Sequence, residues 1–210
     1  MDLINACKSN DTIKALGLIM NNDTNLDSID DFGGTALIYA CQNKMTEVTL
    51  ELIKTGHSKP EQVNEDDNTA LIWACRNGMT EVALELIKTG HANPEQINNY
   101  GNTALILACN IKMKEVALEL IKTGHANHEQ MNKNGNTALI WACQNGMTEV
   151  ALELIKMRHA KSEDGNTALM RAYQNKMMEV TLELFKTDIP PLNKLMNIIF
   201  FLFGHREMMR

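Results

Sequence analysis

Cysteine and histidine are the side chains through which this sequence could carry out redox or metal chemistry. Cysteine stands at five positions, each 34 residues after the last: Cys7, Cys41, Cys75, Cys109 and Cys143. If each copy lies on one of a row of packed helices, neighbouring copies are ~10 Å apart, whereas a disulfide requires Cα atoms closer than ~7 Å. The Cys-x-x-Cys spacing of zinc and redox sites is also absent. We therefore predict buried thiols without a redox role.

Histidine recurs with the same 34-residue interval, at His57, His91, His125 and His159. Zinc holds each ligand at ~2.1 Å, so a column of side chains ~10 Å apart cannot share one ion. The close pair His125 and His128 has no cysteine nearby. A positive charge near a helix C-terminus explains the column better, and we predict no metal ligands.

Catalytic and cofactor-binding motifs are absent from the sequence, including the Gly-x-x-x-x-Gly-Lys phosphate loop, the Gly-x-Ser-x-Gly elbow and His-Glu-x-x-His. Carboxylate pairs such as Glu81 and Glu85 recur in each unit, as expected of a solvated helix face. We therefore predict that the protein is not an enzyme and carries no catalytic residues and no cofactor.

The elements that position these residues follow from a repeat. The string Thr-Ala-Leu begins at Thr35, Thr69, Thr103 and Thr137, and returns at Thr167 after a shorter interval. In the copy at 68–101, Thr69 is a helix N-cap, Asn77-Gly78 ends the first helix, and a second runs from Met79 to about Thr89 before Gly90. Five residues form apolar stripes and are predicted to be buried: Leu71, Ala74, Cys75, Val82 and Leu86.

The unit resembles the ankyrin repeat, which has a hairpin, two antiparallel helices and the string Gly-x-Thr-Pro-Leu-His-x-Ala. Here the string is Gly101-Asn-Thr-Ala-Leu-Ile-Leu-Ala108. The near-identity of the units is similar to the ankyrin proteins of amoebae and of the large DNA viruses that infect them. The resemblance implies an all-α solenoid of stacked helix-turn-helix repeats with short hairpin loops. Because Ile or Met replaces the motif's histidine, the hydrogen-bond network of that histidine with the threonine should be missing.

Six repeats are expected, followed by an apolar tail. Their bounds are 1–32, 33–66, 67–100, 101–134, 135–164 and 165–187, and the tail covers 188–210. The linker after His159 is four residues short, so the hairpin that enters the sixth repeat should be short or distorted. The tail is predicted to be a helix that caps the last repeat through Leu195, Met196 and Ile199. The alternative is self-association through the residues from Ile198 to Phe203.

Partner-binding residues are carried over from the resemblance, which implies contacts at the hairpin tips and at the ends of the first helices. The tip residues are Asp31, Phe32, Glu65, Asp66, Asn99, Tyr100, Lys133, Asn134, Glu163 and Asp164. The helix-end residues are Gln42, Asn43, Arg76, Asn77, Asn110, Ile111, Gln144 and Asn145. Trp73 and Trp141 occupy one position of the first helix, where they either pack between repeats or anchor a partner. The acidic tips would favour a basic partner.

Charge and hydropathy narrow the class of partner. The net charge is −6, with 26 acidic and 20 basic residues, which argues against a nucleic-acid partner. The longest apolar run has six residues, whereas a membrane helix needs about 20. We expect an intracellular protein that lies in the cytoplasm, either of its own cell or of a host cell.

The predicted function is a protein–protein interaction scaffold that binds a partner through its concave face and hairpin tips. The alternatives are an adaptor that recruits substrates to a ubiquitin ligase and a structural repeat protein without a specific partner.

Overall fold

The computed structural model describes residues 2–21, 25–157 and 165–187, and over these residues the secondary structure consists of helices and loops. Each predicted repeat holds two of the twelve helices found there. The first helices of the repeats are α1 (Asp2–Lys8), α3 (Ala36–Gln42), α5 (Ala70–Arg76), α7 (Ala104–Asn110), α9 (Ala138–Gln144) and α11 (Gly165–Gln174). The second helices are α2 (Thr12–Met20), α4 (Thr46–Lys54), α6 (Thr80–Lys88), α8 (Lys114–Lys122), α10 (Thr148–Met157) and α12 (Met178–Thr187).

The predicted helix caps are confirmed. The hydroxyl oxygens of Thr35, Thr69 and Thr103 accept hydrogen bonds of 3.2–3.3 Å from the backbone N–H groups three residues later, which would otherwise lack a partner at the helix N-terminus. Gly90 follows the last turn of α6 with a φ of 71°, the left-handed conformation that ends many helices. The repeated string therefore encodes both ends of each helical hairpin.

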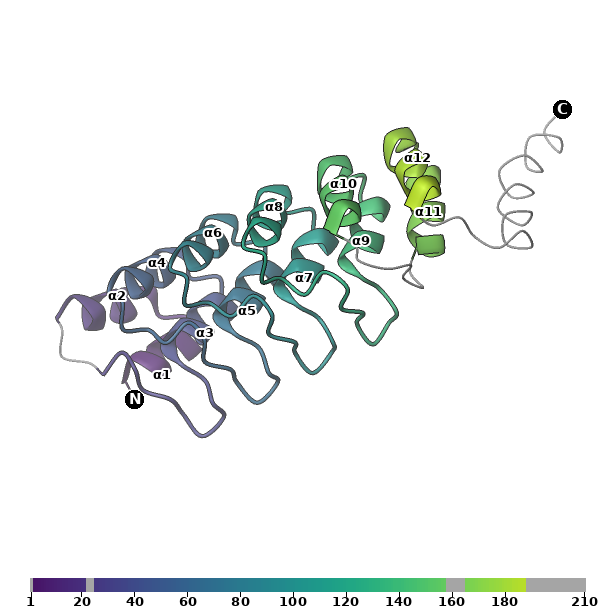
Figure 1. Cartoon of the computed structure of the whole chain (residues 1–210). Helices are drawn as coiled ribbons and strands as arrows, with labels where there is room; N and C mark the ends of the chain where they lie inside the picture. Colours follow the sequence, from purple (N-terminus) through teal and green to yellow (C-terminus); the bar gives the residue numbers. More distant parts are fainter. Residues whose placement is uncertain (1, 22–24, 158–164, 188–210) are drawn as a thin grey trace, which may run out of the picture. The chain divides into compact units, whose positions relative to one another are not determined.

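The chain divides into two compact units, residues 1–138 and 139–210, which are described separately. In the first unit, α1, α3, α5 and α7 pack side by side in one row, and α2, α4, α6 and α8 form a second row behind it (Figure 1). Each helix also packs against the other helix of its own repeat. The hydrophobic core of this unit is therefore the continuous seam between the two rows.

The predicted core columns are confirmed. Leu71, Ala74, Cys75, Val82 and Leu86 have no measurable solvent exposure. All five cysteines of the column also lie buried. Burial raises the pKa of the Cys7 and Cys75 thiols to about 12, so the reactive thiolate is scarce at neutral pH. This agrees with a structural role for the cysteines.

Asparagines connect successive hairpin loops in the first unit. Asn98 Nδ2 donates to Asn68 Oδ1 at 2.9 Å, and Asn132 Nδ2 donates to Asn102 Oδ1 at the same distance. The Oδ1 atom of Asn98 accepts from the backbone N–H groups of Tyr100 and Asn102, which shapes the hairpin. The asparagines therefore supply polar contacts between successive hairpin loops, and the threonines serve as helix caps.

Four hairpin loops, here called the first to fourth fingers, comprise residues 30–34, 64–68, 98–102 and 132–136. They extend from the row that contains α3, α5 and α7 (Figure 1). Each finger donates one backbone hydrogen bond to the finger before it, from Glu65 to Phe32, from Asn99 to Asp66 and from Lys133 to Tyr100, at 2.8–3.1 Å. The side-chain amides of Gln62, Gln96 and Gln130 add a second link at each junction. The finger tips are therefore held in a regular row.

Gly33 is required for the contact between the first two fingers. Its φ is 73°, and a Cβ atom there would lie 2.7 Å from the Val63 carbonyl oxygen. We expect Gly33→Ala to lower the free energy of unfolding by about 2 kcal/mol, because the left-handed conformation alone costs a side chain roughly 1–2 kcal/mol. Chemical denaturation measures the change. Gly90→Ala is the matched control, because its φ is 71° and a Cβ atom there meets no neighbour within 4 Å; equal losses in both variants would contradict the predicted backbone contact.

In the second unit, α12 packs against α10 and α11. Asn175 Nδ2 donates to the carbonyl oxygens of Cys143 and Gln144 at 3.2 and 3.1 Å. Met178 and Leu182 of α12 are largely exposed. The predicted capping helix, the predicted self-association segment and the shortened linker lie at 188–210 and 158–164, outside the described residues. Those predictions therefore stay predictions.

Candidate partner-binding surface

The first unit has a hollow of about 310 Å³ between the third and fourth fingers and the ends of α5 and α7. Six of its lining residues were predicted to bind a partner: Arg76, Tyr100, Asn110, Ile111, Lys133 and Asn134. The remaining ones are Asn98, Asn102 and Leu107. The sequence did not indicate these three as partner-binding residues. Asn98 and Asn102 form the hydrogen bonds between fingers, and Leu107 stands where other repeats have tryptophan. The structure thus brings predicted residues from two neighbouring repeats, 67–100 and 101–134, to one place.

Trp73 supports one wall of the hollow and is not part of its lining. It is half-buried, and its indole N–H is buried without a hydrogen-bond partner among the described residues. The Arg76 guanidinium lies 5.1 Å from the centre of the Trp73 ring, within the range of a cation–π interaction. Trp73 therefore positions Arg76. Its two predicted roles, packing between repeats and anchoring a partner, stay predictions.

The hollow carries positive charge that no acidic group among the described residues neutralises. Neither Arg76 nor Lys133 forms an ion pair with any residue that the structure describes. By contrast, a lysine in the last turn of each of five second helices pairs with the glutamate three residues earlier, at 2.6–3.1 Å. Such exposed pairs add little stability, but they cancel charge on the second helices. Uncompensated cations thus remain at the hollow.

The asparagines at the helix ends have a structural role. Asn43 Nδ2 donates to the Cys7 carbonyl oxygen at 2.7 Å, and Asn77 Nδ2 donates to the Cys41 and Gln42 carbonyl oxygens at 2.9 and 3.0 Å. These carbonyls end the first helix of the preceding repeat. The sequence signal for this contact was that asparagine recurs at the position of Asn43 and Asn77. Ile111 occupies the same position and instead places an apolar side chain, 40% exposed, beside the hollow.

Ile111→Asn is expected to stabilise the protein by about 1 kcal/mol, because it restores a hydrogen bond between repeats. The new amide would face the carbonyls at the end of α5, as Asn77 faces those of α3. Thermal and urea denaturation measure the gain. Ile111→Ala is the control, because it removes the same apolar group without supplying a donor. If asparagine and alanine have equal effects, the contact does not form.

The other predicted residues do not line the hollow. Asp31, Phe32, Gln42, Glu65, Asp66 and Asn99 are exposed in the first unit. Trp141, Gln144 and Asn145 are half-buried in the second unit. Glu163 and Asp164 lie outside the described residues. The first unit alone therefore presents a row of predicted residues along its fingers and helix ends.

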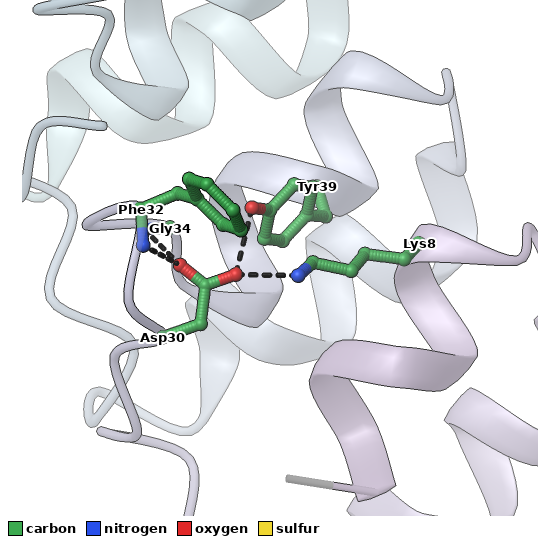
Figure 2. A network of polar contacts seen from close by, with 5 residues as sticks. All are labelled: Lys8, Asp30, Phe32, Gly34 and Tyr39. Carbon is green, nitrogen blue, oxygen red and sulfur yellow. Dashed lines mark hydrogen bonds and ion pairs between the residues drawn. The ribbon is translucent and has the colours of Figure 1, made fainter. Parts of the chain in front are cut away.

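A polar network that sequence reasoning missed joins the first repeat to the first finger (Figure 2). The Lys8 Nζ atom lies 2.6 Å from Asp30 Oδ2, which also accepts a 2.8 Å hydrogen bond from the Tyr39 hydroxyl. Asp30 Oδ1 accepts from the backbone N–H groups of Phe32 and Gly34. Lys8 Nζ also lies 4.7 Å from the centre of the Tyr39 ring. This network secures the start of the finger row.

Asp30 is held in its charged form. Burial alone would raise its pKa, but hydrogen bonds from Lys8, Tyr39 and the backbone lower the pKa to about 2. Gly34 is part of the same arrangement, because a Cβ atom there would overlap the Tyr39 ring. In later fingers asparagine takes the place of both Asp30 and Gly34. The sequence signal for this network was that positions 30 and 34 both differ from the equivalent positions of the later fingers.

Metal-ligand clusters are not found among the described residues. His57, His91 and His125 are exposed on successive linkers, and the structure shows no clustering of them with other candidate ligands. In the same part of the chain, every helix falls short of the length and apolar character needed to cross a bilayer.

The comparisons with known proteins agree with this architecture. The family model for ankyrin repeats (3 copies) matches residues 3–96, 49–130 and 110–193. Among solved structures, the ankyrin repeat protein EF0377 is 25% identical, with a TM-score of 0.68 over 89% of this chain and 98% of that one. A chain from the complex of the predatory endopeptidase Bd0816 of Bdellovibrio bacteriovorus with the immunity protein Bd3460 is 27% identical, with a TM-score of 0.66 and the same coverage. No curated protein matches the sequence. Because the family model matches most of the chain, the chain belongs to the ankyrin-repeat family.

Proposed function

We propose that the protein is a non-enzymatic scaffold that binds a partner protein through its fingers and the ends of its first helices. The observation that carries this proposal is the hollow, in which residues of two neighbouring repeats meet. Repeats of this family generally mediate protein–protein interaction and are typically non-enzymatic. One of the similar structures was determined in a complex of two proteins.

The row of fingers supports this proposal because it is ordered before a partner arrives. Each junction between fingers has a backbone hydrogen bond and a glutamine contact. A preorganised surface loses little conformational entropy on binding. Exposed Phe32 and Tyr100 provide aromatic side chains of the kind that contributes most to interfaces.

The test is affinity capture from a lysate of the cells that produce the protein. The wild-type chain is compared with Tyr100→Ala/Ile111→Ala at the hollow and with Lys88→Ala/Lys122→Ala on α6 and α8 as a matched control. We expect captured proteins to be lost by the first variant and retained by the second. Capture that is equal for all three chains would contradict the proposed surface.

The same experiment separates the alternatives. Ligase subunits among the captured proteins would favour an adaptor that recruits substrates to a ubiquitin ligase. Capture of no protein above background, with a folded bait, would favour a structural repeat protein without a specific partner.

A further inference from the structure

We propose that the hollow binds a peptide segment of the partner in which a carboxylate side chain stands next to a bulky apolar one. This inference rests on the proposed function and adds the chemistry of the partner. The charge of the hollow, its apolar surface and its difference from the neighbouring fingers support this proposal.

The carboxylate follows from the cations. Arg76 and Lys133 both line the hollow, and neither has an acidic partner among the described residues. The Trp73 ring holds the Arg76 guanidinium in place. A planar guanidinium that is already oriented binds a carboxylate through two parallel hydrogen bonds.

The apolar side chain follows from the rest of the lining. Ile111 is 40% exposed and Tyr100 55% exposed, and both adjoin the buried Leu107. The volume of about 310 Å³ is at the lower end of the range for ligand sites. It suits one or two side chains of a peptide better than a large cofactor. Asn134, which also lines the hollow, supplies an amide group for the peptide backbone.

The hollow differs from the surface around it. The first and second fingers carry Asp31, Glu65, Asp66 and Asp67, whereas the third and fourth carry Asn99, Tyr100, Lys133 and Asn134. Opposite charges across an interface select the partner and speed the encounter. A partner that is acidic along its whole length would be repelled by the first two fingers, so the acidic group belongs to the segment that enters the hollow. With a net charge of −6, the chain does not favour a polyanionic nucleic acid there.

The test uses the full-length protein and a phage-displayed library of random peptides. Binders selected on the wild-type chain are sequenced, and their affinities are measured as synthetic peptides for the wild type, for Tyr100→Ala/Ile111→Ala and for two further variants. Arg76→Glu/Lys133→Glu reverses both cations of the hollow. Lys14→Glu/Lys44→Glu is the control with the same change of net charge at exposed lysines outside the hollow. Circular dichroism confirms that both variants retain the wild-type helix content.

We expect the selected peptides to be enriched in Asp or Glu beside a large apolar residue. Their Kd should rise by roughly tenfold or more in the hollow variant, stay nearly unchanged in the control and rise with ionic strength in the wild type. Peptides that lose affinity for Tyr100→Ala/Ile111→Ala but lack acidic residues, or that tolerate the cation reversal, would overturn this inference and leave the proposed function standing. Peptides unaffected by changes at the hollow and the fingers would overturn both.

Discussion

Asp30→Ala is expected to lower the free energy of unfolding by about 2–3 kcal/mol at neutral pH. The carboxylate accepts hydrogen bonds from Lys8, Tyr39 and two backbone N–H groups, and its side chain is only 6% exposed. The shift of its pKa from 3.8 to about 2 corresponds to roughly 2 kcal/mol at 1.36 kcal/mol per pH unit. The loss should concentrate in the first repeat, so amide hydrogen exchange in α1 and α2 should accelerate more than exchange in α7 and α8.

The same network predicts a pH dependence with a definite sign. Because folding lowers the pKa of Asp30, its contribution is fully present above the unfolded-state pKa of about 4 and is lost as the pH falls towards about 2. The difference in unfolding free energy between the wild type and Asp30→Asn should therefore shrink steadily as the pH is lowered from 5 to 2.

Urea denaturation at each pH measures this difference. Asp31→Asn is the control, because Asp31 is the exposed tip residue next to Asp30. A difference between wild type and Asp30→Asn that stays constant over this pH range would contradict the role assigned to the charged carboxylate.

Leu105→Ala is expected to destabilise the protein by about 2–5 kcal/mol, the range for a buried leucine that leaves a cavity. Leu105 lies on α7 without measurable exposure, and α7 packs against both α5 and α8. Few atoms can move into the space, since neighbours on both sides are held by their own repeats. Ile97→Ala is the control at a site that is 38% exposed, where we expect a loss of less than about 1 kcal/mol.

The position of Leu105 also predicts the shape of the unfolding curve. In a repeat stack, stability is a sum of the contributions of the repeats and of the interfaces between them. Weakening an internal repeat should therefore broaden the transition or split it in two, whereas Asp30→Ala should mainly release the first repeat. A single sharp transition at an unchanged midpoint for Leu105→Ala would contradict the assignment of this residue to the core.

The fold could be predicted from the sequence because each repeat encodes it independently. Thr69 caps a helix, Leu71 and Val82 face inward, and Gly90 ends the second helix. The 34-residue interval then places equivalent residues in columns. These are local signals, and repetition makes each of them visible several times.

The candidate site could be predicted only in part. The resemblance indicated Arg76, Tyr100 and Lys133, but only the structure shows that one hollow unites them. Contacts between residues far apart in sequence, such as that of Lys8 with Asp30 or of Asn98 with Asn68, depend on how one finger lies against the next. Helix propensity and hydrophobic periodicity carry no information about how one finger packs against the next. The assignment of Asn43 and Asn77 to a partner surface also did not foresee their bonds to the preceding repeat.

The ladder of asparagines has a consequence for how such an array changes over generations. Internal repeats supply the same bonding groups in the same places, and the segments 68–88 and 136–156 differ only at Arg76 and Gln144. A duplicated internal copy would therefore meet a compatible neighbour on each side, and the array can gain or lose whole units by recombination in register. The first finger does not share this freedom, because Asp30, Gly34 and Tyr39 fit one another and an asparagine at position 34 would overlap the tyrosine ring. Those residues must be inherited together, while the copies that follow them can be exchanged one for another.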